Sequence, residues 1–149
     1  MPSVSIKITK KGFNEVNVFL DGNMKRMQDL TAPLKKGGNL MLRSTHENFK
    51  SQGRPTRWSP LSPKYLKRKL SEGFGFFTLI RKGGLRGSIV FAADKKKLKV
   101  GTSNPYAAAH QFGSPQRNLP KRPFLVFQDK DIERINILIA RHMIGRDDG

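Results

Sequence analysis

Two stretches in which apolar residues recur every three or four positions place the strongest constraint on the fold of this chain. The first runs from Thr31 to about Lys50, and the second from Asp129 to Met143. This spacing puts the apolar side chains on one face of a helix, and such a face needs another element to pack against. The sequence therefore predicts two amphipathic helices that are buried on one side.

Each of these helices has a distinctive beginning. Thr31 is predicted to cap the first helix, and Pro33 lies inside its first turn. Inside this helix the pair Gly37-Gly38 indicates a kink or a close approach by another backbone. Asp129 is predicted to cap the last helix, where carboxylates near the N-terminus are favourable. The two expected apolar faces consist of Leu34, Met41, Leu42, Thr45 and Phe49, and of Ile132, Ile135, Ile139 and Met143.

Other segments show the period of two that is typical of strands. Apolar and polar residues alternate from Ser3 to Thr9, which predicts a half-buried strand. Ser88–Ala92 and Leu98–Thr102 predict a hairpin around the charged turn 94–97. Phe124–Phe127 is predicted to be a short apolar strand.

The remaining elements are predicted to be helices. Asn14 is a plausible cap for a helix whose face is formed by Val16, Leu20, Met24, Met27 and Leu30, although Gly22 would allow its first half to be extended. Short helices are expected from Ser62-Pro63 to Ser71 and from Pro105 to Gln111, the latter stopped by Gly113.

Together these elements predict an α+β fold, with several helices packed against a small antiparallel β-sheet. A length of 149 residues fits one domain, so residues 1–149 are assigned to a single domain with a mobile basic and aromatic loop around residues 51–87. No run of 18 apolar residues is present, and the first residues do not resemble a secretory signal, so we expect synthesis and folding in a cytoplasm and no contact with a membrane.

The net charge of the chain is +18, and it is unevenly distributed. Residues 48–128 contain 17 Lys or Arg and only two acids, a net of +15, whereas the rest of the chain has 12 bases and 9 acids, a net of +3. A positive potential of this kind attracts polyanions or an acidic protein surface. The charge does not decide between nucleic acid and an acidic protein as the partner. It also fits a solvated face that only keeps copies of the protein apart.

No motif for catalysis, metal binding or cofactor binding is found. Cysteine is absent, and the three histidines are far apart in the sequence. The glycine-rich segment 83–87 lacks the Gly-Lys-Ser/Thr of a phosphate-binding loop. Acidic residues at 129, 131 and 133 fit a helix N-terminus better than a metal site. His110 could act as a base, but a hydrogen-bonded packing role is favoured, so we predict no catalytic residues and no cofactors.

Aromatic residues alternate with basic ones in the middle of the chain. The pairs Arg57-Trp58 and Lys64-Tyr65 precede an aromatic segment, Phe74–Phe77. Such an arrangement can stack the bases of single-stranded nucleic acid, but no RNA-binding signature accompanies it. Packing in the core or at a subunit interface is the favoured role.

Four ordered blocks from Phe49 onward resemble the phage virion morphogenesis family, the tail-completion proteins of Mu-like and P2-like phages. The blocks cover about 100 residues of the chain. The third block, Val100-Gly101-Thr102 followed by residues 106–113, is similar to the most distinctive stretch of the family, and the first block ends with Trp58-Ser59-Pro60-Leu61-Ser62. The four blocks are Phe49–Ser62, Leu79–Ile89, Val100–Gly113 and Arg122–Leu125.

The resemblance implies a non-enzymatic structural protein that completes the tail and helps to join it to the head. Related completion proteins form rings, so we expect a homo-oligomeric ring on a template. The expected partners are the tail tube, head and neck proteins, and DNA in the channel. The expected location is the virion, at the tail or neck, after synthesis in the bacterial host. A stand-alone basic nucleic-acid-binding protein is the alternative, and a nuclease with His110 as base is less favoured.

The residues of these blocks also have a physical interpretation. Gly101 and Gly113 suit tight turns, and Arg122 is placed to make a bidentate contact with a carboxylate or with backbone carbonyls. Phe124 is expected to anchor its segment in the core. The residues predicted to shape the subunit and its interfaces are Trp58, Leu85, Arg86, Gly101, Tyr106, His110, Gln111, Phe112, Gly113, Arg122, Pro123 and Phe124.

Overall fold

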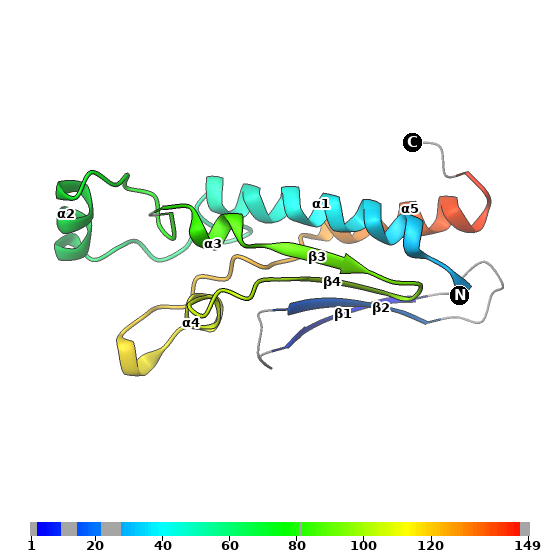
Figure 1. The fold of residues 1–149 in the computed structure, drawn as a ribbon, viewed down its shortest axis with the longest axis horizontal. Coiled ribbons are helices and arrows are strands. Elements are labelled where there is room, and N and C mark those ends of the chain that lie inside the picture. The colour runs from blue at the N-terminus through cyan, green and yellow to red at the C-terminus, as the bar shows by residue number, and fades with distance from the viewer. Residues whose placement is uncertain (1–2, 10–14, 22–27, 81, 147–149) are drawn as a thin grey trace.

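Two long helices lie side by side over one face of a four-stranded antiparallel sheet (Figure 1). The computed structural model describes residues 3–9, 15–21, 28–80 and 82–146 of the chain. The long helices are α1 (Thr31–Lys50) and α5 (Asp129–Met143), and they run in opposite directions. This arrangement confirms the predicted α+β class.

The sheet has the strand order β1-β2-β4-β3. Its strands are β1 (Ser3–Thr9), β2 (Glu15–Asp21), β3 (Val90–Ala93) and β4 (Lys97–Gly101). The predicted first strand and the predicted hairpin are therefore confirmed. The hairpin turn is closed by Asp94, whose Oδ1 accepts hydrogen bonds from the backbone N–H groups of Lys96 and Lys97 at 2.9 and 2.8 Å.

Strand β2 occupies the segment for which a helix was predicted. In the register of the sheet Val16 pairs with Val100 and Val18 with Leu98. The β-branched residues of this segment favour a strand, and pairing with β4 outweighs the weak helical spacing. The helix prediction is thus wrong from Glu15 to Asp21, where the extended alternative is confirmed. Asn14 and residues 22–27, which belonged to the same prediction, lie outside the described residues.

Helix α1 has the predicted length, but its N-terminus differs from the prediction. Leu30 is the N-cap residue, and the first turn is held by Asp29, whose Oδ1 accepts a hydrogen bond from Thr31 N at 3.0 Å. The helix continues through Gly37-Gly38. A Cβ at Gly38 would clash with the ring of Phe91 in β3, so the close approach at this pair comes from side chains of the sheet and of α5.

Two predictions near the C-terminal helix are wrong. Phe124–Phe127 forms no strand, because its backbone is bonded to side chains and not to the sheet. Gln128, not Asp129, is the N-cap of α5, and its backbone N–H donates to Oδ2 of Asp131 at 3.1 Å. The predicted apolar face is present, with Ile135 and Ile139 buried.

The short helices lie at one end of the molecule. They are α2 (Pro63–Ser71), α3 (Gly84–Gly87), α4 (Ala107–Phe112) and the 3-10 turn Pro115–Arg117. The predicted helices at 62–71 and 105–111 are confirmed, with Ser62 as the N-cap of α2 and Gly113 (φ 78°) ending α4. The segment around 51–87 thus contains α2 and α3, while its mobility stays a prediction.

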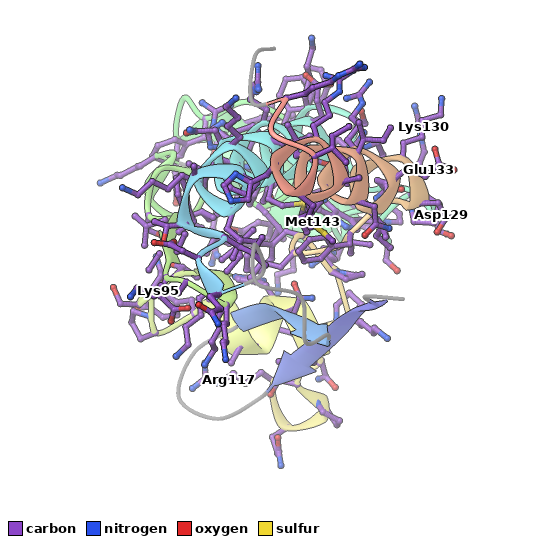
Figure 2. The ribbon with its side chains drawn as sticks, turned by 90° about the vertical axis from the view of Figure 1, so that its right-hand side faces the viewer. Lys95, Arg117, Asp129, Lys130, Glu133 and Met143 are labelled. Atoms are coloured by element: carbon purple, nitrogen blue, oxygen red, sulfur yellow. The ribbon has the colours of Figure 1, made fainter. Side chains whose placement is uncertain are left out.

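One apolar core lies between the helices and the sheet. Figure 2 shows α1 and α5 nearly end-on as one layer, with Met143 pointing from α5 toward the interior. The described part of the chain has no helix that is both long and apolar enough to cross a bilayer. The most deeply buried side chains are Leu30, Leu34, Met41, Phe49, Leu98, Val100, Phe124, Leu125 and Ile135.

Candidate functional site

Three of the four blocks singled out in the sequence meet around the irregular segment 122–125, which we call the junction. Trp58, in the loop after α1, donates from Nε1 to the carbonyl oxygen of Pro123 at 2.9 Å. The backbone N–H of Arg122 donates to the carbonyl oxygen of His110 at 2.8 Å. Residues from the first, third and fourth blocks are therefore bonded directly to one another.

The side chain of Gln111 makes the hydrogen bonds to the junction's backbone that a neighbouring strand would otherwise make. Its side chain is only 2% exposed. Oε1 accepts hydrogen bonds from the N–H groups of Phe124 and Leu125, both at 3.0 Å, and Nε2 donates to the carbonyl oxygen of Leu125 at 3.0 Å. Asn48 of α1 donates to the carbonyl oxygen of Phe124 at 2.8 Å. Buried backbone groups must find partners, and here two side-chain amides supply them.

Arg122 makes the bidentate contact that was predicted for it, with backbone carbonyls. Its Nε donates to the carbonyl oxygen of Ser59 at 2.8 Å and its Nη2 to that of Pro60 at 3.0 Å. The side chain is buried, and burial lowers the pKa of the guanidinium from its ordinary value. Arginine nevertheless remains charged at any physiological pH. Arg122 therefore fixes the loop 59–60 against the body of the protein.

An aromatic cluster lies beneath these hydrogen bonds. The ring of Phe49 meets that of Trp58 edge to face, with 5.6 Å between the centroids, and that of Phe124 at the same distance. Pairs of this geometry add to the free energy of burial. Trp58 and Phe124 thus have the core-packing role that was favoured for them.

A second polar network at the junction was missed in the sequence. Arg54 donates to Oδ1 of Asn48 at 2.9 Å and to the carbonyl oxygen of Ser44 at 2.6 Å. Ser44 in turn donates from Oγ to Oδ2 of Asp131, which is buried at the start of α5. The sequence feature that could have indicated this network is the presence of Ser44, Thr45 and Asn48 on the buried face of α1, among apolar residues. This network joins α1 to the N-terminus of α5.

His110 lies beside the junction without a hydrogen bond from its Nδ1 to any described residue. Burial lowers the pKa of its imidazole, and the charge of Arg122 lowers it further. The ring is therefore neutral near pH 7, as a packing residue would be. The hydrogen bond predicted for this side chain is not made at Nδ1. Within the ranges that the structure describes, no group of three His, Cys, Asp or Glu could hold a metal ion.

The other predicted residues differ in how exposed they are. Leu85 is buried in the core, whereas Arg86 beside it on α3 is exposed. Gly101 pairs with Val90 at the end of the hairpin. Phe112 is half-buried and Tyr106 is 63% exposed. A Cβ at Gly113 would lie 3.1 Å from the backbone nitrogen of Lys121, and the residue has a positive φ, so both the space and the backbone favour glycine.

Two segments extend from the body on this side of the molecule (Figure 1). One, which we call the arm, comprises α2 and residues 72–77, and the other is the loop 113–121 with its 3-10 turn. The arm exposes Lys64, Lys67 and Arg68, and beyond them Phe76, which is 65% exposed and stacks on the partly exposed ring of Phe77. An exposed aromatic pair beside basic residues is a feature of contact surfaces.

Comparison with known proteins gives a consistent result. The model of the phage virion morphogenesis family matches residues 12–144. The chain is 32% identical over 106 residues to the Mu-like prophage FluMu G protein 2 of Haemophilus influenzae, covering 67% of this chain and 69% of that protein. It is 37% identical over 103 residues to an uncharacterised protein of Methanocaldococcus jannaschii, covering 64% and 73% of the two chains. No solved structure matches.

Proposed function

Since the chain belongs to the phage virion morphogenesis family, and so has a role in the structure and assembly of phage particles, we propose that it completes a phage tail and helps to join it to the head. The observation that supports this most strongly is that the motif residues form hydrogen bonds within the subunit. Trp58, Gln111 and Arg122 direct their polar groups to the chain's own backbone. Such residues build a subunit, and contacts with neighbours are left to the exposed arm and loop.

We further propose that the subunit acts without catalysis. Two motif residues with chemically useful groups, Arg122 and Gln111, are already engaged in internal hydrogen bonds. A nucleophile or general base needs a group that can reach a substrate. His110 has a ring that is partly buried beside the cationic Arg122, which disfavours the protonated form that a base must pass through.

In the virion the subunit is proposed to form a ring of identical copies through heterologous contacts. A net charge of +18 opposes association of the free protein, because copies repel one another. The ring would therefore assemble on a template whose surface is acidic. Tail-tube, head and neck proteins are the proposed partners, with DNA in the channel as a further contact.

Removal of the protein from the phage or prophage that encodes it tests this proposal. Filled heads and tails of normal length should accumulate separately, and electron microscopy of lysates would show them. Purified protein added to such a lysate should restore joined particles. Joined, infectious particles produced in its absence would contradict the proposal.

The alternative function is binding of nucleic acid by the protein alone. It is favoured by the arm, where Lys64, Lys67 and Arg68 are exposed and Arg68 lies over the ring of Tyr65, 5.1 Å from its centroid. This function requires tight binding of DNA or RNA by the isolated protein. Titration of a labelled oligonucleotide at several salt concentrations would distinguish this function from the assembly function, because phosphate contacts weaken steeply with salt.

A further inference from the structure

An open groove of about 500 Å³ lies between α1 and α5, away from the junction. Its lining is cationic and apolar, with no acidic residue: Lys36, Asn39, Leu40, Arg43, Arg134, Ile137, Leu138 and Arg141. The four bases are exposed, and Ile137 is 50% exposed. Figure 2, which looks along the two helices, shows nitrogen-tipped side chains standing above both of them on the side away from the sheet.

The two helices contribute to the groove with the same spacing. In α1 the lining residues are 36, 39, 40 and 43, and in α5 they are 134, 137, 138 and 141, so both sets follow the i, i+3, i+4, i+7 pattern. A base stands at each end of both sets, with Leu40 and Leu138 between them. The groove is thus about two helical turns, or roughly 10 Å, in length, with an apolar floor and positive charge at both ends.

The three arginines of the groove are exposed and can be reached by a partner. Within the residues that the structure describes, no ion pair joins Arg43, Arg134 or Arg141 to a carboxylate. A second copy of this chain is a poor occupant, because apposed grooves would bring four bases against four. Nucleic acid is also a poor occupant of the floor, since Leu40, Ile137 and Leu138 offer a phosphate no hydrogen bond.

We propose that this groove binds an amphipathic helix of an acidic protein partner, with the helix's apolar face on Ile137 and Leu40 and its carboxylates at the basic ends. An amphipathic helix that lies in a groove is anchored by apolar residues on one of its faces. Here the apolar part of the groove is flanked by bases that can meet the carboxylates of such a helix. The inference rests on the proposed function, because it supplies an assembly subunit with a surface for a neighbouring virion protein.

Binding of a synthetic peptide to the purified full chain tests this proposal. The peptide is an amphipathic helix of about 18 residues with leucine on one face and glutamate on the other. Fluorescence anisotropy would compare the native protein with Arg43→Glu/Arg134→Glu and with Ile137→Ser. The control is Lys95→Glu/Arg117→Glu, which changes the net charge equally at two exposed residues on the sheet side of the molecule (Figure 2).

We expect the double groove variant to weaken peptide binding about tenfold or more, Ile137→Ser to weaken it measurably, and the control to leave it nearly unchanged. Equal losses in the groove variant and in the control would overturn the proposal. So would equal binding of polyglutamate, which lacks an apolar face, or tighter binding of duplex DNA that depends on the same arginines. Melting temperatures confirm that each variant is folded, and because no tail is needed, failure here is distinct from failure of the joining assay.

Discussion

The junction and the arm contain the same kinds of residue and use them in opposite ways. At the junction, Arg122 and Trp58 are buried and their donors are bonded to backbone carbonyls of the same chain. On the arm, Arg68 and Phe76 are exposed. The comparison teaches that the sequence blocks typical of the family mark where the subunit is held together. The exposed side chains of the arm lie outside these blocks, so we expect changes there to affect assembly more than stability.

The largest expected effect on stability comes from Gln111→Ala. This change leaves two buried N–H groups and one carbonyl of the junction without partners, and each unsatisfied group costs about 1–3 kcal/mol. We expect the free energy of unfolding, measured with urea, to fall by about 3 kcal/mol or more. The matched control Gln116→Ala, in the exposed loop, should change it by less than about 0.5 kcal/mol. A similar loss of unfolding free energy in both variants would contradict the special role of the junction in stability.

A smaller effect is expected for Trp58→Phe. The aromatic contact with Phe49 is largely retained, but the hydrogen bond to the carbonyl oxygen of Pro123 is lost. The free energy of unfolding should fall by about 1–2 kcal/mol, measured in the same way. No loss would mean that the indole N–H contributes nothing to the junction.

His110, beside the junction, is expected to make the stability of the protein depend on pH. Burial lowers the pKa of its imidazole below the ordinary value of 6.5 in the folded state, so the unfolded chain binds the proton more readily. The contribution of His110 to stability is therefore present above pH 6.5 and is lost as the pH falls below it. We expect His110→Gln to reduce the loss of melting temperature between pH 7 and pH 5. An identical pH profile for the two proteins would contradict this.

The smallest effect on stability is expected for the arm. Replacing both Phe76 and Phe77 with serine should change the free energy of unfolding by less than about 0.5 kcal/mol, because both rings are exposed. Head–tail joining in the complementation assay should nevertheless fall sharply. Ile144→Ser, at an equally exposed apolar residue near the end of α5, is the control for joining. Full joining by the arm variant would assign the contacts to another surface.

The parts of the fold that could be predicted are those with regular periodicity. The spacing in α1 and α5 determines which face of each helix is buried, and the structure confirms it. The alternation in β1 predicts a strand, which the structure also confirms. Strand β2 could not be predicted with the same ease, because Val16 and Leu20 fit a helical stripe as well as a strand. Pairing with β4, a contact between distant segments, decides between the two.

Several residues of the junction were singled out in the sequence, but of their bonds only the bidentate contact of Arg122 was predicted. Trp58, Gln111, Arg122 and Phe124 were identified by their motifs, and Arg122 by its chemistry. The role of Gln111 depends on the backbone of Phe124 and Leu125, which was itself expected to be a strand. Asp131 was interpreted as a favourable carboxylate near a helix N-terminus, and nothing local indicates that Ser44 would reach it.

Cryo-electron microscopy of the assembled particle tests the central claim most directly. If the chain is a structural subunit, copies of it form a ring at the end of the tail that meets the head, with the arm in contact with a neighbouring subunit. Particles that join and infect without this protein in the virion would contradict the claim.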